Sequence, residues 1–282
     1  MPIADGGGGT AEALAISLGG TWHRAEVSDP LGRLVEARWL VLPDGSAVVE
    51  VAEAVGLARL GPDELDPIAA SSRGLGELVQ AALEADADAL LVCLGDSATV
   101  DGGAGLLEVL DGLPVPTRVL CDVRNPLLGP RGAAHVFGPQ KGASAEQVDQ
   151  LEARLAALDR LRPYADLPGA GAAGGLGAAF AALGGALVEG APLVLDLIGF
   201  RDRLLGAELV VTGEGTVDRT TSEGKAPGAA LRVCGEARVR CVLFGGRIVE
   251  PLPGAELHEL SGDATRARED LIALGEMLGT TL

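Results

Sequence analysis

Two lysines stand out as residues that could do chemistry. The chain has 22 lysines and arginines, and among them only Lys141 and Lys225 are lysine. Each lies beside a glycine, in Pro139-Gln140-Lys141-Gly142 and in Gly224-Lys225. An ammonium is a compact, mobile point charge suited to a phosphate, whereas a guanidinium is a planar fork. We interpret the two lysines as candidate anion ligands, and the alternative is chance survival in an arginine-biased composition.

Acidic residues follow several of the apolar strands that the sequence predicts. They are Asp101, Asp122, Glu214 and Asp218. In open α/β sheets ligands bind at the carboxyl ends of the strands, so these acids and both lysines are expected to share one crevice. Carboxylates there can hold Mg²⁺ or accept a proton from a hydroxyl, while lysines and loop N–H groups can hold phosphates. For any single acid we favour capping of a helix N-terminus, and for the whole set we favour a site.

Two common nucleotide-binding motifs do not fit. A P-loop needs Ser or Thr after Gly-Lys, but Ala226 follows Lys225. The stretch Gly169-Ala170-Gly171-Ala172-Ala173-Gly174 matches the dinucleotide fingerprint, but no buried strand precedes it. Its glycines could instead bind an anion at a helix N-terminus or let two backbones pack closely. No Ser/His/Asp or Cys/His nucleophile set and no zinc-ligand spacing is present.

The elements that must position these residues alternate along the chain. Residues 21–27, 34–42 and 47–51 predict an antiparallel meander separated by turn residues. Helices are predicted at 76–86, after Ser144 with Gln147 completing a capping box, and at 264–278 with Leu271, Leu274 and Leu278 on one face. Strands are predicted at 89–94, 118–123, from Leu209 into a glycine turn, and at 239–244 ending in Gly245-Gly246. This alternation indicates an α/β fold.

The composition of the chain narrows the classes of molecule that it could bind. The net charge of −18 argues against nucleic acid and against anionic membrane surfaces. The sequence shows no signal peptide and no apolar run that could cross a membrane, and its four cysteines lack metal-like spacing, so we expect a reduced, cytoplasmic protein. Self-association into a homo-oligomer stays open.

Six motifs, five of them containing glycines, succeed one another along the chain. They are Pro2-Ile3-Ala4-Asp5-Gly6-Gly7, residues 96–105, Cys121-Asp122-Val123 with Asn125-Pro126, Phe137 to Gly142, Pro168 to Gly177, and Thr212-Gly213-Glu214-Gly215 with Asp218 and Gly224-Lys225-Ala226-Pro227. In this order they resemble the type I glycerate kinase family over nearly the whole chain.

The resemblance implies ATP-dependent phosphorylation of D-glycerate to a phosphoglycerate, with Mg²⁺. It also implies two α/β domains with the active site in the cleft between them. One domain would be discontinuous, with Rossmann- or flavodoxin-like character, from residues 1–30 plus 210–282; the other, 31–209, would be inserted. The implied catalytic residues are Asp101, Asp122, Lys141, Glu214, Asp218 and Lys225, with Asp122, Glu214 and Asp218 at the metal. The implied substrate and nucleotide contacts are Asp5, Gly6, Gly7, Ser97, Thr99, Asn125, Gln140, Gly171, Gly174, Gly213 and Gly215.

The chain departs from the family pattern at several positions. The opening strand and its Asp-Ser-Phe/Tyr-Lys type loop are absent, so we expect a first strand to be missing. Gly8 stands where the family has Glu, Asp96 where it has Gly, and Val100 where it has Asn. Two functions therefore stay open. One is an active glycerate kinase, and the other is a catalytically impaired relative that binds a ligand or partner without turnover.

Overall fold

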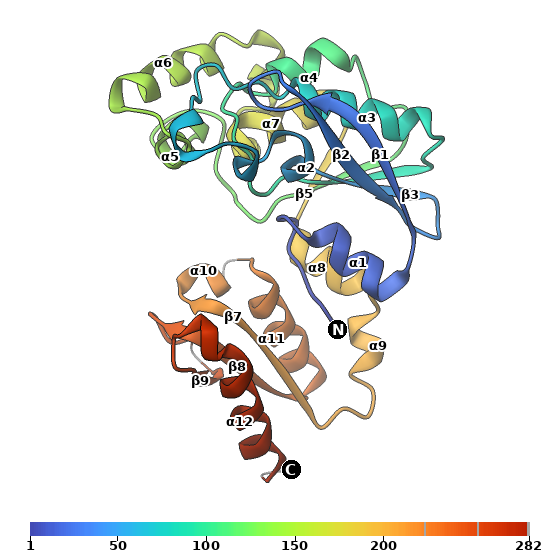
Figure 1. Cartoon of the computed structure of the whole chain (residues 1–282), viewed down its shortest axis with the longest axis vertical. Helices are drawn as coiled ribbons and strands as arrows, with labels where there is room; N and C mark the ends of the chain where they lie inside the picture. Colours follow the sequence, from blue (N-terminus) through green and yellow to red (C-terminus); the bar gives the residue numbers. More distant parts are fainter. Residues whose placement is uncertain (223, 253, 281–282) are drawn as a thin grey trace. The chain divides into compact units, whose positions relative to one another are not determined.

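The computed structural model describes residues 1–222, 224–252 and 254–280. The chain is an α/β protein that divides into two compact units, Met1–Gly190 and Ala191–Leu282 (Figure 1). Residues 1–30 fall in the first unit by their contacts. A discontinuous domain built from both chain ends thus stays a prediction. Among the described residues no helix is both long and apolar enough to span a bilayer.

The first unit is built on a mixed six-stranded sheet, in which the strands follow one another in chain order. The strands are β1 (Thr21–Ser28), β2 (Leu34–Val41), β3 (Ser46–Glu50), β4 (Ala89–Cys93), β5 (Thr117–Leu120) and β6 (Ala186–Val188). The first three are antiparallel, which confirms the predicted meander, and β3 to β6 are parallel. Strand β4 is all-apolar, and its run Leu90–Cys93 is fully buried, as expected for a strand covered on both faces.

Helices and short 3₁₀ turns complete the first unit. The α-helices are α1 (Thr10–Leu18), α2 (Val51–Val55), α3 (Arg73–Glu84), α4 (Ala104–Val109), α5 (Ala133–Phe137), α6 (Ala145–Ala156) and α7 (Ala172–Ala182). The 3₁₀ turns are η1 (Leu57–Arg59), η2 (Pro62–Glu64), η3 (Pro139–Lys141) and η4 (Asp159–Tyr164). The predicted capping box of α6 is confirmed, with Ser144 and Gln147 exchanging hydrogen bonds. One continuous core joins the sheet to α3 and α7, with Leu78 and Phe180 fully buried.

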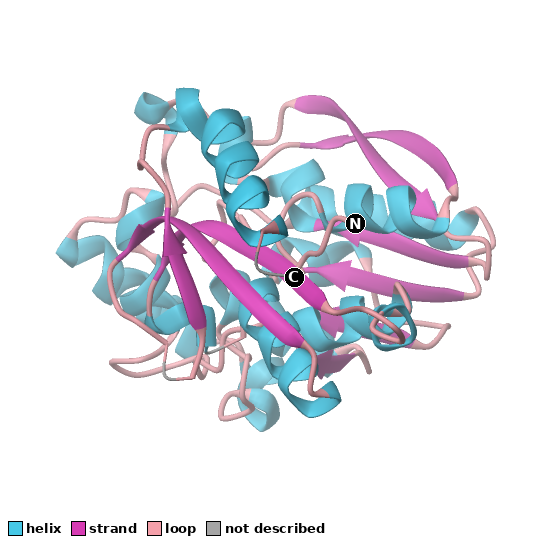
Figure 2. Ribbon diagram, turned by 90° about the horizontal axis from the view of Figure 1, so that it is seen from below, coloured by secondary structure: helices cyan, strands magenta, loops and turns pink. Residues whose placement is uncertain are grey.

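The second unit is smaller and holds a parallel sheet of three strands, β7 (Leu209–Val217), β8 (Arg240–Ile248) and β9 (Glu256–Glu259). Figure 2 shows these strands side by side. The helices assigned here are α8 (Gly190–Leu197), α9 (Phe200–Arg203), α10 (Arg219–Ser222), α11 (Ala226–Ala237) and α12 (Ala267–Gly279), with the 3₁₀ turn η5 (Ala264–Arg266). On the face of α12 that carries Leu271, Leu274 and Leu278, the last two are buried and Leu271 is 40 % exposed.

The glycine turn predicted after Leu209 and the strand end predicted at Gly245-Gly246 are both wrong. β7 continues through Gly213 and Gly215 to Val217, and β8 continues through Gly245 to Ile248. Gly213 pairs with Phe244 across the ladder, and a Cβ on Gly213 would lie 2.4 Å from the Phe244 carbonyl oxygen. These glycines therefore let two strands approach closely rather than reverse the chain.

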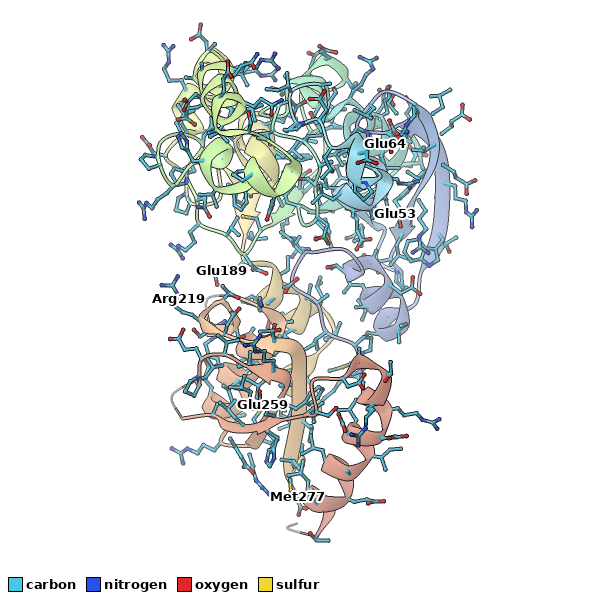
Figure 3. The ribbon with its side chains drawn as sticks, turned by 60° about the vertical axis from the view of Figure 1, so that its left-hand side comes forward. Glu53, Glu64, Glu189, Arg219, Glu259 and Met277 are labelled. Atoms are coloured by element: carbon cyan, nitrogen blue, oxygen red, sulfur yellow. The ribbon has the colours of Figure 1, made fainter. Side chains whose placement is uncertain are left out.

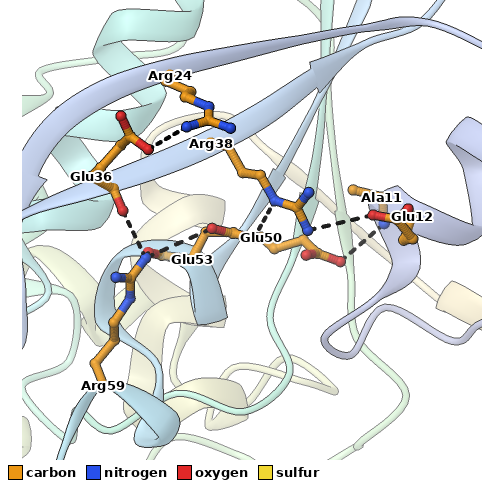
Figure 4. Close-up of polar contacts among 8 residues, drawn as sticks. All are labelled: Ala11, Glu12, Arg24, Glu36, Arg38, Glu50, Glu53 and Arg59. Carbon is orange, nitrogen blue, oxygen red and sulfur yellow. Dashed lines mark hydrogen bonds and ion pairs between the residues drawn. The ribbon is translucent and has the colours of Figure 1, made fainter.

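Helix α1 is fastened to the sheet by charged groups (Figure 4). The buried carboxylate of Glu50, at the end of β3, accepts a hydrogen bond of 2.9 Å from the Ala11 N–H in the first turn of the helix. Arg38 on β2 pairs with Glu53 and with Glu12 on the helix. Because no side chain at Gly9 can cap α1, Glu50 satisfies an N-terminal donor from outside the helix. This contact fixes the loop at residues 5–9 that leads into α1.

We expect Glu50→Ala to lower the free energy of unfolding by about 1–2 kcal/mol, because a buried helix N–H loses its acceptor. The matched control is Glu12→Ala on the same helix, where only an exposed ion pair is lost and the change should stay within about 0.5 kcal/mol. Urea unfolding of both variants measures this. Equal losses for the two variants would contradict the anchoring role of Glu50.

Candidate functional site

A cavity of about 380 Å³ opens in the first unit at the carboxyl ends of β4 and β5. Its walls come from the loop at residues 5–7, the segments that follow these two strands, the η3 turn, and the start of α7. Seven of the predicted site residues line it, and they are Asp5, Gly6, Gly7, Ser97, Asp122, Gln140 and Lys141. The edge of the sheet predicted to hold the ligand therefore holds a cavity.

Glycine backbones form one wall of the cavity. The Gly95 N–H donates to the Gly6 carbonyl oxygen at 3.0 Å, and a Cβ on Gly95 would lie 2.3 Å from the Cα of Gly7. Gly6 has φ of 97°, and a Cβ there would lie 2.8 Å from the Cβ of Leu120. No side chain fits at these contacts. Thr10 secures the loop from within, since its hydroxyl accepts from the Gly6 N–H and donates to the Gly7 carbonyl.

Lys141 is the one cation among the described residues that line the cavity. It is 3 % exposed, and its Nζ donates at 2.7 Å to the Ser97 hydroxyl and at 2.7 Å to the Thr99 carbonyl oxygen. Burial lowers the pKa of Lys141 from 10.5 to about 7, and the nearby charge of Asp101 opposes that shift. The Thr99 hydroxyl is also buried, and within the described residues it has no hydrogen-bond partner. The pocket wall thus carries a titratable amine, and Thr99 is not among the residues that line the cavity.

Asp5 and Asp122 bring carboxylates to the cavity. Asp122 Oδ1 accepts a hydrogen bond of 2.8 Å from the Gly190 N–H, and Asp5 Oδ1 accepts one of 3.3 Å from the Gly7 N–H. Asp96, which we had noted as a departure from the family pattern, lines the same cavity. Its backbone is left-handed, with φ of 63°. A non-glycine residue in the left-handed region is uncommon, and such residues cluster at functional sites, so this conformation marks Asp96 as a candidate.

Asp101 does not line the cavity. Its carboxylate accepts hydrogen bonds from the Ser72 N–H, the Ser72 hydroxyl, and the N–H groups of Gly103 and Gly105 at the start of α4. This is the helix-capping use that we favoured for any single acid. Asp101 holds the loop that carries Thr99, and its electrostatic effect on Lys141 is its link to the site.

The remaining first-unit candidates are not among the residues that line the cavity, and their predicted roles stay predictions; they are Thr99, Asn125, Gly171 and Gly174. A Cβ on Gly174 would lie 2.0 Å from the Thr99 carbonyl oxygen, and one on Gly171 would lie 2.2 Å from the Pro126 carbonyl oxygen. Asn125 donates to the Arg131 carbonyl at 2.8 Å. The cavity is lined here by Ala172 and Ala173 instead. Close backbone packing, one of the two uses we left open for these glycines, is the one their surroundings favour.

The second unit gathers the other predicted residues. Lys225 Nζ lies 3.1 Å from Glu214 Oε2 and 3.9 Å from Asp218 Oδ1, and Glu214 Oε1 accepts from the buried Thr221 hydroxyl at 2.6 Å. The Thr220 hydroxyl, together with its N–H and Lys225, lowers the pKa of Asp218. The sequence analysis did not identify Thr220 and Thr221, although an Asp whose side chain accepts a hydrogen bond from the N–H two residues later, as Asp218 does from Thr220, is a common turn pattern.

A second hollow of about 850 Å³ lies beside this cluster, lined by Glu214, Gly215 and the segment from Glu259 to Asp263. Glu259, labelled in Figure 3, accepts a hydrogen bond of 2.9 Å from the Ile248 N–H and so joins β9 to β8. Gly213 is not among the residues that line the hollow. The predicted roles of all these residues stay predictions.

We expect the lowered pKa of Lys141 to appear in the pH dependence of stability. Between its folded pKa of about 7 and its usual 10.5, the unfolded state binds more protons, so stability rises with pH. From pH 7 to pH 9 the free energy of unfolding of the wild type should gain about 2 kcal/mol relative to Lys141→Met. Urea unfolding at both pH values measures the difference, and parallel pH profiles would contradict it.

Comparison with known proteins places this geometry in a family. The family model described as the glycerate kinase family matches residues 1–114 and 113–265. An uncharacterised protein of Mycobacterium bovis is 42 % identical over 264 residues, covering 88 % of this chain and 69 % of the relative. The glycerate 2-kinase of Escherichia coli is 38 % identical over 267 residues, covering 80 % of this chain and 70 % of the relative.

A solved structure agrees with the sequence relatives. The crystal structure of a putative glycerate kinase 2 from Salmonella typhimurium LT2 superposes with a TM-score of 0.82 at 31 % identity. It covers 100 % of this chain and 89 % of the other. The family model, the sequence relatives and the solved structure agree, and the chain belongs to the glycerate kinase family.

Proposed function

We propose that this chain phosphorylates D-glycerate with ATP and Mg²⁺, giving a phosphoglycerate. The observation that carries the proposal is the cavity of the first unit, where a buried ammonium, an amide and carboxylates meet. A hydroxy acid carries a carboxylate and hydroxyl groups. Lys141 and Gln140 supply donors for the carboxylate, and Asp5 and Asp122 supply acceptors for the hydroxyls. The volume of about 380 Å³ suits a small ligand.

The lowered pKa of Lys141 fits an anion as the ligand. A neutral lysine amine costs little to bury, and an arriving carboxylate favours its protonation. A carboxylate of Asp5 or Asp122 within reach of an acceptor hydroxyl can take its proton as that oxygen attacks phosphorus.

Magnesium fits the residues of the second unit. Within the described residues no group of three or more His, Cys, Asp and Glu side chains is arranged to hold a metal ion. Mg²⁺ bound to a nucleotide needs only one or two protein carboxylates, because phosphate oxygens and waters complete its shell. Glu214 and Asp218 are the pair we propose for this role, and the metal would neutralise charge on the phosphates.

Lys225 is the cation we propose for the phosphates. Its ammonium is 37 % exposed and is held between Glu214 and Asp218. It is the N-cap residue of helix α11 (Ala226–Ala237), and the N-terminal end of a helix favours negative charge nearby. The second candidate function, a relative that binds ligand without turnover, rests on the departures at Gly8, Asp96 and Val100.

The test of the proposal is ADP release with D-glycerate, ATP and Mg²⁺, against the same mixture without D-glycerate. We expect release that depends on D-glycerate and stops when EDTA removes Mg²⁺. Binding of D-glycerate by calorimetry without turnover would favour the second candidate. Neither binding nor turnover would overturn both.

For Lys225→Ala we expect a loss of ATP affinity of about tenfold or more, because a charged hydrogen bond to phosphate is lost. Arg268→Ala, an exposed cation on α12 of the same unit, is the matched control and should leave the affinity unchanged. Calorimetry with ATP and Mg²⁺ measures both. Unchanged affinity in Lys225→Ala would mean that this lysine serves packing.

A further inference from the structure

We propose that Asp96 supplies the cavity with the carboxylate that position 8 lacks, and that it binds a hydroxyl group of the acceptor. Gly8 and Asp96 would then be one matched pair rather than two separate losses. This inference rests on the proposed function, which it deepens by naming a residue that determines acceptor specificity. The negative charge that the family pattern has at position 8 would then lie at position 96 in this chain.

The two positions meet in space although 88 residues separate them along the chain. The Gly8 N–H donates a hydrogen bond of 3.0 Å to Asp96 Oδ2. The same carboxylate oxygen lies 3.8 Å from the site of a Cβ on Gly7, which in turn lies 3.4 Å from Asp5 Oδ1. Two carboxylates therefore flank one glycine loop at the wall of the cavity.

A side chain at position 8 and the Asp96 carboxylate compete for the same space. A Cβ on Gly8 would lie 2.9 Å from Asp96 Oδ2, closer than a van der Waals contact. It would push the carboxylate off the Gly8 N–H, and a Glu there would add a second negative charge beside the first. A side chain at position 8 therefore requires the Asp96 carboxylate to move from its present place.

The backbone conformation of Asp96 supports a functional role for its side chain. A φ of 63° is strained for any residue with a Cβ, and glycine removes that strain. Within the described part of the chain, its second oxygen, Oδ1, takes no hydrogen bond from the protein, and the residue lines the cavity. An exposed carboxylate oxygen at the wall of a cavity is an acceptor for a ligand hydroxyl.

The test uses four proteins: wild type, Asp96→Gly, Gly8→Glu, and the double variant. We expect Asp96→Gly to raise KM for D-glycerate about tenfold while KM for ATP stays within about twofold, because one charged hydrogen bond to the acceptor is lost. Gly8→Glu alone should lower both Tm and kcat/KM. The double variant should regain Tm and most of kcat/KM, because a carboxylate again has room.

Asp86→Gly is the matched control. Asp86 is exposed, has φ of 57° at the end of α3, and does not line the cavity. Both Asp→Gly variants should keep or raise Tm, and only Asp96→Gly should change KM for D-glycerate. Unchanged KM in Asp96→Gly, or a double variant no better than Gly8→Glu, would overturn the inference.

Failure of the proposed kinase activity can be distinguished from failure of the inference about Asp96. If the wild type binds D-glycerate in calorimetry but does not turn it over, the kinase activity is contradicted. The roles of Gly8 and Asp96 can still be tested, with dissociation constants for D-glycerate in place of KM. A wild type that neither binds nor turns over D-glycerate overturns both proposals.

Discussion

The contact on which the first unit depends is the approach of two backbones, at Gly7 and at Gly95. A loop from the N-terminal segment and a loop from the end of β4 share the hydrogen bond from the Gly95 N–H to the Gly6 carbonyl oxygen. They can approach this closely because Gly95 has no side chain, since a Cβ there would lie 2.3 Å from the Gly7 Cα. Helix α1 then fixes the direction of the first loop, and Glu50 fixes α1. The cavity is the space left beside this contact, so its shape follows from backbone packing before any catalytic group is placed.

Charge within the cavity is arranged around a single buried ammonium. Lys141 gives its hydrogen bonds to Ser97 and Thr99, while carboxylates stand elsewhere on the wall. A protein with a net charge of −18 would repel an organic acid over long distances, so binding an anion requires a local exception. Because burial lowers the pKa of Lys141 to about 7, its amine can be neutral in the empty cavity, and a bound anion favours the protonated form. The second unit handles charge differently, with an exposed lysine already paired to two acids.

Much of the fold could be predicted from the sequence, because apolar runs and turn residues are local signals. The meander, the buried strand at Leu90–Cys93 and the capping box at Ser144 follow from spacing alone. Predictions made from glycines were wrong where a residue distant in the sequence requires the glycine. Gly213 is typical of a turn, but its lack of a side chain makes room for Phe244 on the neighbouring strand. Asp101 and Asp122 look alike in sequence, yet one caps a helix and the other lines the cavity. Only tertiary contacts separate them.

The glycine wall also limits how this pocket can be altered. Positions such as Gly6 and Gly95 offer no route to new specificity, because any side chain there would meet backbone or a buried neighbour. Variation is confined to wall positions that already carry a Cβ, among them Ala172 and Ala173 at the start of α7. A library built to accept larger hydroxy acids would therefore gain by randomising those few positions and holding the glycines constant.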